Sequence, residues 1–133
     1  MFNGKRILLV DDDARVLFVL HAALRRLGDG LYIATATHGH QALKLVRQDH
    51  FDLLITDLRL PGLDGIALTE AIRKLTHDPV VIWITAHGCH EVSTAAARLN
   101  VYRCLDKPLE ISEIREVTRE ALRVAAQTVN NTR

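Results

Sequence analysis

The chain has 133 residues, of which 48% are hydrophobic and 25% charged, and this composition is typical of one globular domain with a full hydrophobic core. Its formal net charge is +1 and it has no long basic run, which argues against nucleic-acid binding by bulk electrostatics. The longest apolar stretch, residues 80–84, is too short to span a bilayer, and no signal-peptide pattern precedes residue 11, so we expect a cytoplasmic protein without membrane association.

Apolar runs alternate with helical patterns along the chain, and this alternation is typical of a parallel sheet built from βα units. Strands are predicted over residues 6–10, 31–36, 52–57, 80–85 and 101–105. Helices are predicted over residues 16–27, 41–48, 66–75, 91–99 and 114–125, where apolar residues recur at helical spacing. The second and fifth strands are less apolar and are expected at the sheet edges. We therefore predict one α/β domain over residues 1–127 and a polar, disordered tail over residues 128–133.

Single residues mark several of the predicted element ends. Asp13 is expected to cap the first helix, and Asp64 suits the turn before the third. Gly28 is the predicted stop of the first helix and Asn100 that of the fourth, because both residue types tolerate the left-handed backbone conformation.

Two apolar runs end in carboxylates. Residues 53–56 lead into Asp57 and then into a loop rich in proline and glycine, and residues 7–10 lead into Asp11, Asp12 and Asp13. If these strands are neighbours, the acids share one crevice at the carboxyl ends of the strands, where open α/β sheets bind ligands. Like charges in such a crevice repel one another, so the arrangement predicts a hard divalent cation held by oxygen ligands.

Two further strands end near polar groups, Thr85 in one case and Lys107 in the other. Each of these residues alone is most often a cap or a turn residue. Their recurrence at corresponding strand ends favours a functional site there.

The sequence resembles the receiver domains of two-component response regulators. Four motifs carry the resemblance, in the order and at the spacings of that family: residues 7–13, residues 57–65, Thr85-Ala86-His87 and Lys107-Pro108. The resemblance implies a flavodoxin-like (βα)5 fold, a doubly wound parallel sheet of five strands in the order 2-1-3-4-5. In that fold the first and third strands flank the ligand site.

The resemblance also implies the roles of the acids. It makes Asp57 the phosphoacceptor, a nucleophile toward the phosphohistidine of a histidine kinase. It implies Mg²⁺, for which Mn²⁺ can substitute, bound by Asp12, Asp57 and the backbone carbonyl of Arg59, with Asp11 acting through water.

The remaining motifs are expected to bind the phosphate. Lys107 and Thr85 would contact phosphoryl oxygens, and the small Ala86 would allow the phosphate to approach closely. The Lys107–Pro108 peptide bond is expected to be cis, as it is across the family.

Cys104 is a departure from the family. Many receivers have Tyr or Phe at this switch position, three residues before the lysine, and the ring turns inward when the threonine moves, which a thiol cannot imitate. Tyr102 is predicted to share the side of the strand with Cys104 by alternation and to substitute in part. Arg59 and His87 occupy positions at which the family tunes the lifetime of the phosphate.

The resemblance predicts a signalling switch rather than an enzyme. Its expected partners are a sensor histidine kinase or histidine phosphotransfer protein and a downstream effector, contacted through the fourth helix, fifth strand and fifth helix, a face that also allows a phosphorylation-dependent dimer. No output module follows the last helix, so we expect a stand-alone receiver or one excised from a longer protein.

Two alternative functions stay open. One is a phosphorylation-independent interaction module, which Cys104 favours; the other is a Mg²⁺-dependent phosphohydrolase, although such enzymes commonly have a second aspartate where this chain has Arg59.

The histidines and cysteines offer a weaker alternative, a zinc site. Neither His38 with His40 nor His87 with Cys89 and His90 supplies four ligands at the spacing of structural zinc, so solvated histidines are predicted. The two cysteines do not make a disulfide framework, and reduced thiols are expected in the cytoplasm.

Overall fold

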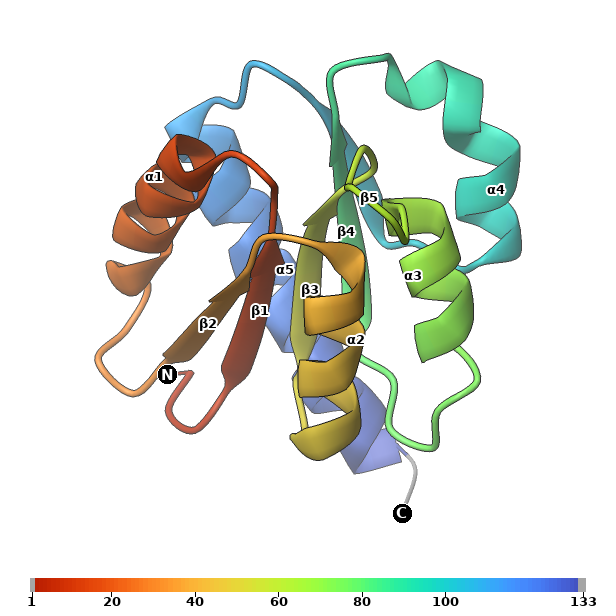
Figure 1. The fold of residues 1–133 in the computed structure, drawn as a ribbon. Coiled ribbons are helices and arrows are strands. Elements are labelled where there is room, and N and C mark those ends of the chain that lie inside the picture. Colours follow the sequence, from red (N-terminus) through yellow and green to blue (C-terminus); the bar gives the residue numbers. More distant parts are fainter. Residues whose placement is uncertain (1, 132–133) are drawn as a thin grey trace.

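Five short strands form a parallel sheet at the centre of the structure, a computed structural model that describes residues 2–131 (Figure 1). The strands are β1 (Arg6–Val10), β2 (Tyr32–Ala36), β3 (Leu53–Asp57), β4 (Val80–Thr85) and β5 (Arg103–Asp106). Their order is β2-β1-β3-β4-β5, which confirms the predicted flavodoxin-like topology and both edge strands. The order makes β1 and β3 neighbours, with Leu8 opposite Leu54.

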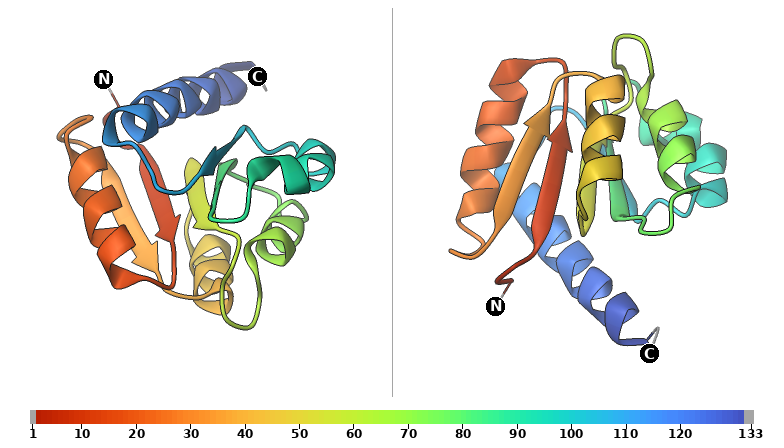
Figure 2. Two further views of the ribbon diagram at one scale, coloured as in Figure 1. Left: turned by 90° about the horizontal axis from the view of Figure 1, so that it is seen from above. Right: turned by 60° about the horizontal axis from the view of Figure 1, so that its bottom comes forward.

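The helices lie on both faces of this sheet. They are α1 (Ala14–Arg25), α2 (Gly39–Gln48), α3 (Gly65–Ile72), α4 (Ser93–Arg98) and α5 (Ile111–Asn131), and a 3₁₀ turn, η1 (Cys89–Val92), precedes α4. Helices α1 and α5 cover one face, whereas α2, α3 and α4 cover the other (Figure 1, Figure 2). In the described residues, no helix has both the length and the apolar character that a membrane span requires.

The hydrophobic core consists of two clusters, one on each face of the sheet. Successive side chains of a strand point to opposite faces, so Ile7 and Leu9 pack against α1 and α5 while Leu8 and Val10 pack against the other layer. Because both faces are covered, the central strands need apolar residues at every position. This requirement explains the continuous apolar runs in the sequence.

Of the four single residues predicted to mark element ends, three agree with the structure and one does not. Asp13 caps α1 and Asp64 caps α3, each by accepting a hydrogen bond from a backbone N–H in the first turn. Asn100 has a φ of 55°, the left-handed conformation predicted for it. Gly28 is not the helix stop, because α1 already ends at Arg25.

The predicted ends of the last two helices need correction. Helix α5 runs to Asn131, whereas the sequence predicted a tail from residue 128; no proline or glycine interrupts residues 109–131, so polarity alone does not end the helix. Residues 132–133 of that tail lie outside the described residues. The helix predicted over residues 91–99 begins as the 3₁₀ turn η1, and neither η1 nor α4 has a side-chain N-cap.

Candidate functional site

Three carboxylates meet at the carboxyl ends of β1 and β3. Asp11 and Asp12 directly follow β1, and Asp57 is the last residue of the neighbouring strand β3. One oxygen of each carboxylate lies within 4.8 Å of the corresponding oxygens of the other two. Asp11 and Asp57 are buried, whereas Asp12 is exposed. Across residues 2–131, this is the one group of acids, histidines and cysteines found with the spacing of a metal site.

The ammonium group of Lys107 lies against two of these carboxylates. Its Nζ donates hydrogen bonds to Asp11 Oδ2 at 2.9 Å and to Asp57 Oδ2 at 3.1 Å. Lys107 follows β5, and its backbone N–H donates to the carbonyl oxygen of Thr85 at 2.8 Å, which anchors it beside the end of β4. The peptide bond between Lys107 and Pro108 is cis. One positive charge thus faces three negative charges.

The environment shifts the pKa of Asp11 and of Lys107. Burial raises the pKa of the Asp11 carboxyl, and hydrogen bonds from the Asp13 N–H and from Lys107 only partly oppose this. Burial alone would lower the pKa of Lys107, but its hydrogen bonds to Asp11 and Asp57 raise the pKa overall. Lys107 therefore stays charged at neutral pH.

Backbone N–H groups orient the two buried carboxylates. The N–H of Asp13 donates to Asp11 Oδ1 at 2.9 Å, and the N–H of Arg59 donates to Asp57 Oδ1 at 3.3 Å. Each buried carboxylate therefore uses one oxygen for a backbone donor and the other for Lys107. The Arg59 side chain itself is exposed.

Thr85 ends β4 next to the acids. The sheet register pairs Asp57, the last residue of β3, with Ile84 of β4. Thr85, whose side chain is buried, therefore lies one residue beyond the end of β3. The Thr85 hydroxyl accepts a hydrogen bond from the N–H of His87 at 3.1 Å and keeps its own proton for donation. Ala86 and His87 are exposed.

A buried chain of hydrogen bonds supports the loop after Asp57, and the sequence reasoning missed it. Trp83 Nε1 donates to Thr69 Oγ1 at 2.9 Å, and that hydroxyl donates to the carbonyl oxygen of Gly65 at 2.8 Å. A Cβ at Gly65 would lie 2.7 Å from Leu58 Cα, so only glycine fits there. The tryptophan in a predicted buried strand could have indicated this hydrogen bond, because a buried indole N–H requires an acceptor.

Cys89 and Cys104 form a disulfide in the structure, which contradicts the predicted reduced thiols. The start of η1 lies beside β5, where the backbone N–H of Cys89 donates to Asp106 Oδ1 at 2.9 Å. The cysteines are 15 residues apart in sequence, so tertiary packing of η1 on β5 brings them together.

Tyr102 does not share the side of Cys104, contrary to the prediction. Strand β5 begins only at Arg103, so the alternation of the strand does not extend back to Tyr102. Tyr102 packs with the α1 and α5 cluster, whereas Cys104 packs with the opposite cluster. Tyr102 therefore lies on the opposite side of the sheet from Cys104 at the switch position.

The histidines considered for zinc do not gather into a metal site. His38, His40, His87 and His90 are exposed, as predicted. His38 has a structural role instead, because its Nδ1 accepts a hydrogen bond from the N–H of Gln41 and so caps α2.

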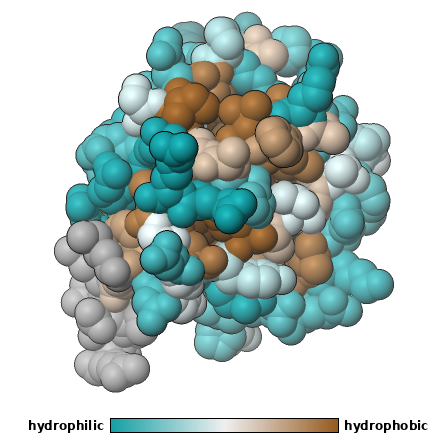
Figure 3. Space-filling model, turned by 90° about the vertical axis from the view of Figure 1, so that its left-hand side faces the viewer, coloured by the Kyte–Doolittle hydropathy of each residue, from teal (hydrophilic) through white to brown (hydrophobic). Residues whose placement is uncertain are grey.

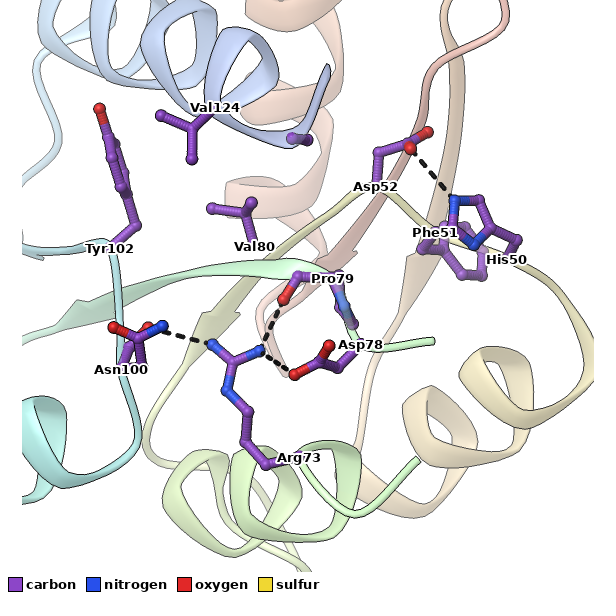
Figure 4. A pocket seen from close by; sticks show the side chains of 11 residues that line it. His50, Phe51, Asp52, Arg73, Asp78, Pro79, Val80, Asn100, Tyr102 and Val124 are labelled. Carbon is purple, nitrogen blue, oxygen red and sulfur yellow. Dashed lines mark hydrogen bonds and ion pairs between the residues drawn. The ribbon is translucent and has the colours of Figure 1, made fainter. Parts of the chain in front are cut away.

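A hollow of about 300 Å³ lies at the opposite end of the sheet and is lined by Tyr102 and Arg73, among other residues (Figure 4). Arg73 donates to the carbonyl oxygens of Leu99 at 2.8 Å, Pro79 at 2.7 Å and Asn100 at 3.2 Å, and its Nη1 also contacts Asp78 Oδ2 at 3.0 Å. These partners hold the guanidinium in place. Arg73 therefore clamps two loops together, the one before β4 and the one before β5, rather than presenting its charge to a ligand.

A groove of about 660 Å³ borders Lys107 on the side of α1 and α5. Its lining is largely apolar and includes Val19 and Ile111. Figure 3 shows apolar side chains gathered on this face of the molecule, and Phe18 of α1 is 76% exposed. A largely apolar surface groove therefore lies beside the acidic site.

The chain is similar in sequence to known regulatory proteins. Residues 7–119 match the family model of the response regulator receiver domain. The transcriptional regulatory protein ZraR of Salmonella typhimurium is 36% identical over 129 residues, covering 96% of this chain and 29% of that protein. The DNA-binding transcriptional regulator NtrC of the same organism is 34% identical, covering 79% of this chain and 22% of its own length. The chain thus spans less than a third of these curated relatives.

Solved structures are similar in fold. A CheY-like response regulator receiver domain protein from Methanospirillum hungatei superimposes with a TM-score of 0.85 at 26% identity, covering 93% of this chain and 98% of that one. A putative response regulator from Chloroflexus aurantiacus gives a TM-score of 0.79 at 30% identity, covering 89% and 97%. With the family match over residues 7–119 and the strand order 2-1-3-4-5, this chain belongs to the receiver domains of two-component response regulators.

Proposed function

We propose that Asp57 accepts a phosphoryl group from the phosphohistidine of a sensor histidine kinase or a histidine phosphotransfer protein. The main support is the position of Lys107, whose Nζ donates hydrogen bonds to both Asp57 and Asp11. Phosphoryl transfer depends chiefly on positioning and on positive charge near the equatorial oxygens. A charged lysine beside one carboxylate at the end of a central strand meets both needs.

The proposed reaction is an in-line displacement. A carboxylate oxygen of Asp57 attacks phosphorus, the P–N bond of phosphohistidine breaks, and the bonding electron pair stays with the imidazole, which takes up a proton. Asp57 is 6% exposed, so the donor reaches it through the crevice above β1 and β3. The backbone N–H of Arg59 and the ammonium of Lys107 orient the carboxylate before the attack.

We propose Mg²⁺, for which Mn²⁺ can substitute, as the cation of this site. Asp12, Asp57 and the backbone carbonyl of Arg59 would bind it directly, and Asp11 through water. The donor set fits, because carboxylate oxygens within 4.8 Å of one another suit a hard divalent ion and the exposed Asp12 leaves the cluster open to solvent. When bound, the ion supplies positive charge that offsets the charge of the transferring group.

Phosphorylation would switch the domain by adding about two negative charges beside Thr85 and Lys107. The Thr85 hydroxyl and the Lys107 ammonium would then bind phosphoryl oxygens, with Ala86 leaving room for them. Thr85 pairs with Asp106 of β5, Lys107 follows that strand, and the chain continues from Thr85 through η1 into α4. The proposed switch is a shift in the equilibrium of α4 and β5, with a coupling of about 1–3 kcal/mol. The face formed by α4, β5 and α5 would then contact an effector or a second copy of the domain.

Arg59 and His87 are proposed to set the lifetime of the phosphate. Both side chains are exposed, and each follows a site residue by two positions, Asp57 in one case and Thr85 in the other. Hydrolysis of the phosphorylated protein, compared between the parent and Arg59→Ala or His87→Ala, measures their effects. An unchanged rate in both variants would exclude this role.

Incubation with acetyl phosphate and Mg²⁺, followed by intact mass spectrometry, tests the proposed function. One phosphoryl group is expected on the parent chain and on the exposed control Asp29→Asn, and none on Asp57→Asn or in the presence of a chelator. Absence of phosphate from the parent would refute the proposal and favour a phosphorylation-independent interaction module. Fast release of inorganic phosphate from many equivalents of donor, without accumulated phosphoprotein, would favour a phosphohydrolase.

A further inference from the structure

Cys89 and Cys104 connect two segments that flank the acidic site. Cys89 begins η1 shortly after Thr85, and Cys104 lies in β5 shortly before Lys107. The Cα atoms of the two cysteines are 5.7 Å apart, a distance at which a disulfide forms without backbone movement. Both side chains are partly exposed, so small thiols and disulfides can reach them.

The segment that this disulfide anchors is otherwise weakly held. Among the residues described for η1 and α4, none is buried, and neither element has a side-chain N-cap. Its polar contacts include the exposed hydrogen bond from the Cys89 N–H to Asp106 and the exposed pair of Arg98 with Glu70 at 3.1 Å. A segment with few buried contacts opens at low free-energy cost, so a covalent tether changes its freedom more than it would change a core strand.

We propose that Cys89 and Cys104 form a reversible disulfide that locks η1 onto β5 and makes phosphorylation of this domain sensitive to thiol redox state. In the oxidation, the thiolate of one cysteine attacks a low-molecular-weight disulfide such as oxidised glutathione and releases one glutathione thiol. The second cysteine then attacks the mixed disulfide and releases the other. Two protein thiols thus lose two protons and two electrons, and the oxidant leaves as two thiols.

The lock acts on the segment that moves in the proposed switch. In the oxidised form η1 is held where Thr85 already accepts the hydrogen bond from the His87 N–H, which limits rearrangement toward a phosphoryl group. Reduction frees η1 and α4 to follow Thr85. This effect on phosphorylation rests on the proposed function, whereas formation of the disulfide does not.

Thiol counting tests the disulfide without reference to phosphorylation. The chain is equilibrated in glutathione buffers from fully reduced to fully oxidised, quenched with acid, alkylated with a maleimide and weighed by mass spectrometry. Two adducts are expected on the reduced chain and none on an oxidised monomer in which peptide mapping links Cys89 to Cys104. Two adducts at every ratio, a disulfide between chains, or glutathione adducts alone would overturn the proposal. Cys89→Ser, the matched control, cannot form the internal link.

Phosphorylation of the oxidised and reduced chains tests the coupling. With acetyl phosphate and Mg²⁺, we expect Asp57 to be phosphorylated at least threefold more slowly in the oxidised parent than in the reduced parent. Cys89→Ser should give one rate under both conditions. Equal rates in a parent whose disulfide has formed overturn the coupling. If neither form accepts phosphate, the proposed function fails and the coupling fails with it, while the thiol count still decides whether the disulfide exists.

Discussion

Replacing Asp12 by asparagine is expected to stabilise the metal-free domain. Asp12 belongs to two of the three carboxylate pairs in the acidic cluster, whose oxygens lie within 4.8 Å of one another. Lys107 pairs with Asp11 and Asp57, so the substitution leaves both of those ion pairs in place. It therefore removes repulsion without removing a described salt bridge.

The magnitude follows from Coulomb's law. Two unit charges 4.8 Å apart repel by about 0.9 kcal/mol in water, and water is the appropriate medium because Asp12 is exposed. Screening at 0.1 M salt reduces each pair to about 0.5 kcal/mol. Loss of two pairs, less the opposing attraction between Asp12 and Lys107, should raise the free energy of unfolding by up to about 1 kcal/mol, and by more at lower salt.

Urea unfolding measures this effect, with the fluorescence of Trp83, the single tryptophan and fully buried, as the signal. In a chelator, Asp12→Asn should be more stable than the parent, and the exposed control Asp29→Asn should not differ from it. Mg²⁺ at ten times its Kd should stabilise the parent by about 1.4 kcal/mol and leave Asp12→Asn almost unchanged. The electrostatic account would be refuted if metal-free Asp12→Asn were less stable than the metal-free parent. It would also be refuted if Mg²⁺ raised the free energy of unfolding of Asp12→Asn as much as that of the parent.

Three further substitutions test the supports of the site. Trp83→Phe should lower the free energy of unfolding by about 1–3 kcal/mol, seen by circular dichroism, since it removes the hydrogen bond to Thr69 and leaves a void. Gly65→Ala should slow phosphorylation and lower the melting temperature, because its Cβ would meet the Asp57 carbonyl; an unchanged rate would contradict the tight approach. Arg73→Met should cost about 2–3 kcal/mol by leaving backbone carbonyls unpaired, and a variant as stable as the parent would show that the clamp is dispensable.

The fold could be predicted because the sheet imposes a simple pattern on the sequence. Strands covered on both faces must be apolar throughout, and each is followed by an amphipathic helix. The order of the strands cannot be predicted from this local pattern, because it depends on pairing between strands that are far apart in sequence. It was predicted only from the resemblance of four motifs to a known family. Once β1 and β3 are neighbours, the grouping of Asp11, Asp12 and Asp57 follows from their places at strand ends.

The features that escaped prediction depend on tertiary packing. The disulfide requires η1 to lie on β5, and no local pattern around Cys89 or Cys104 specifies that contact. Tyr102 was assigned to the wrong side because alternation was extended past the start of β5 at Arg103. The hydrogen bond between Trp83 and Thr69 joins a strand to a helix, so neither residue alone reveals it.

The sheet also divides the core into two parts that are packed separately. Helices α1 and α5 rest on one side of it, next to the apolar groove at Lys107, and α4 rests on the other. Substitutions beneath α4 can therefore accumulate over evolution without disturbing the layer of α1 and α5.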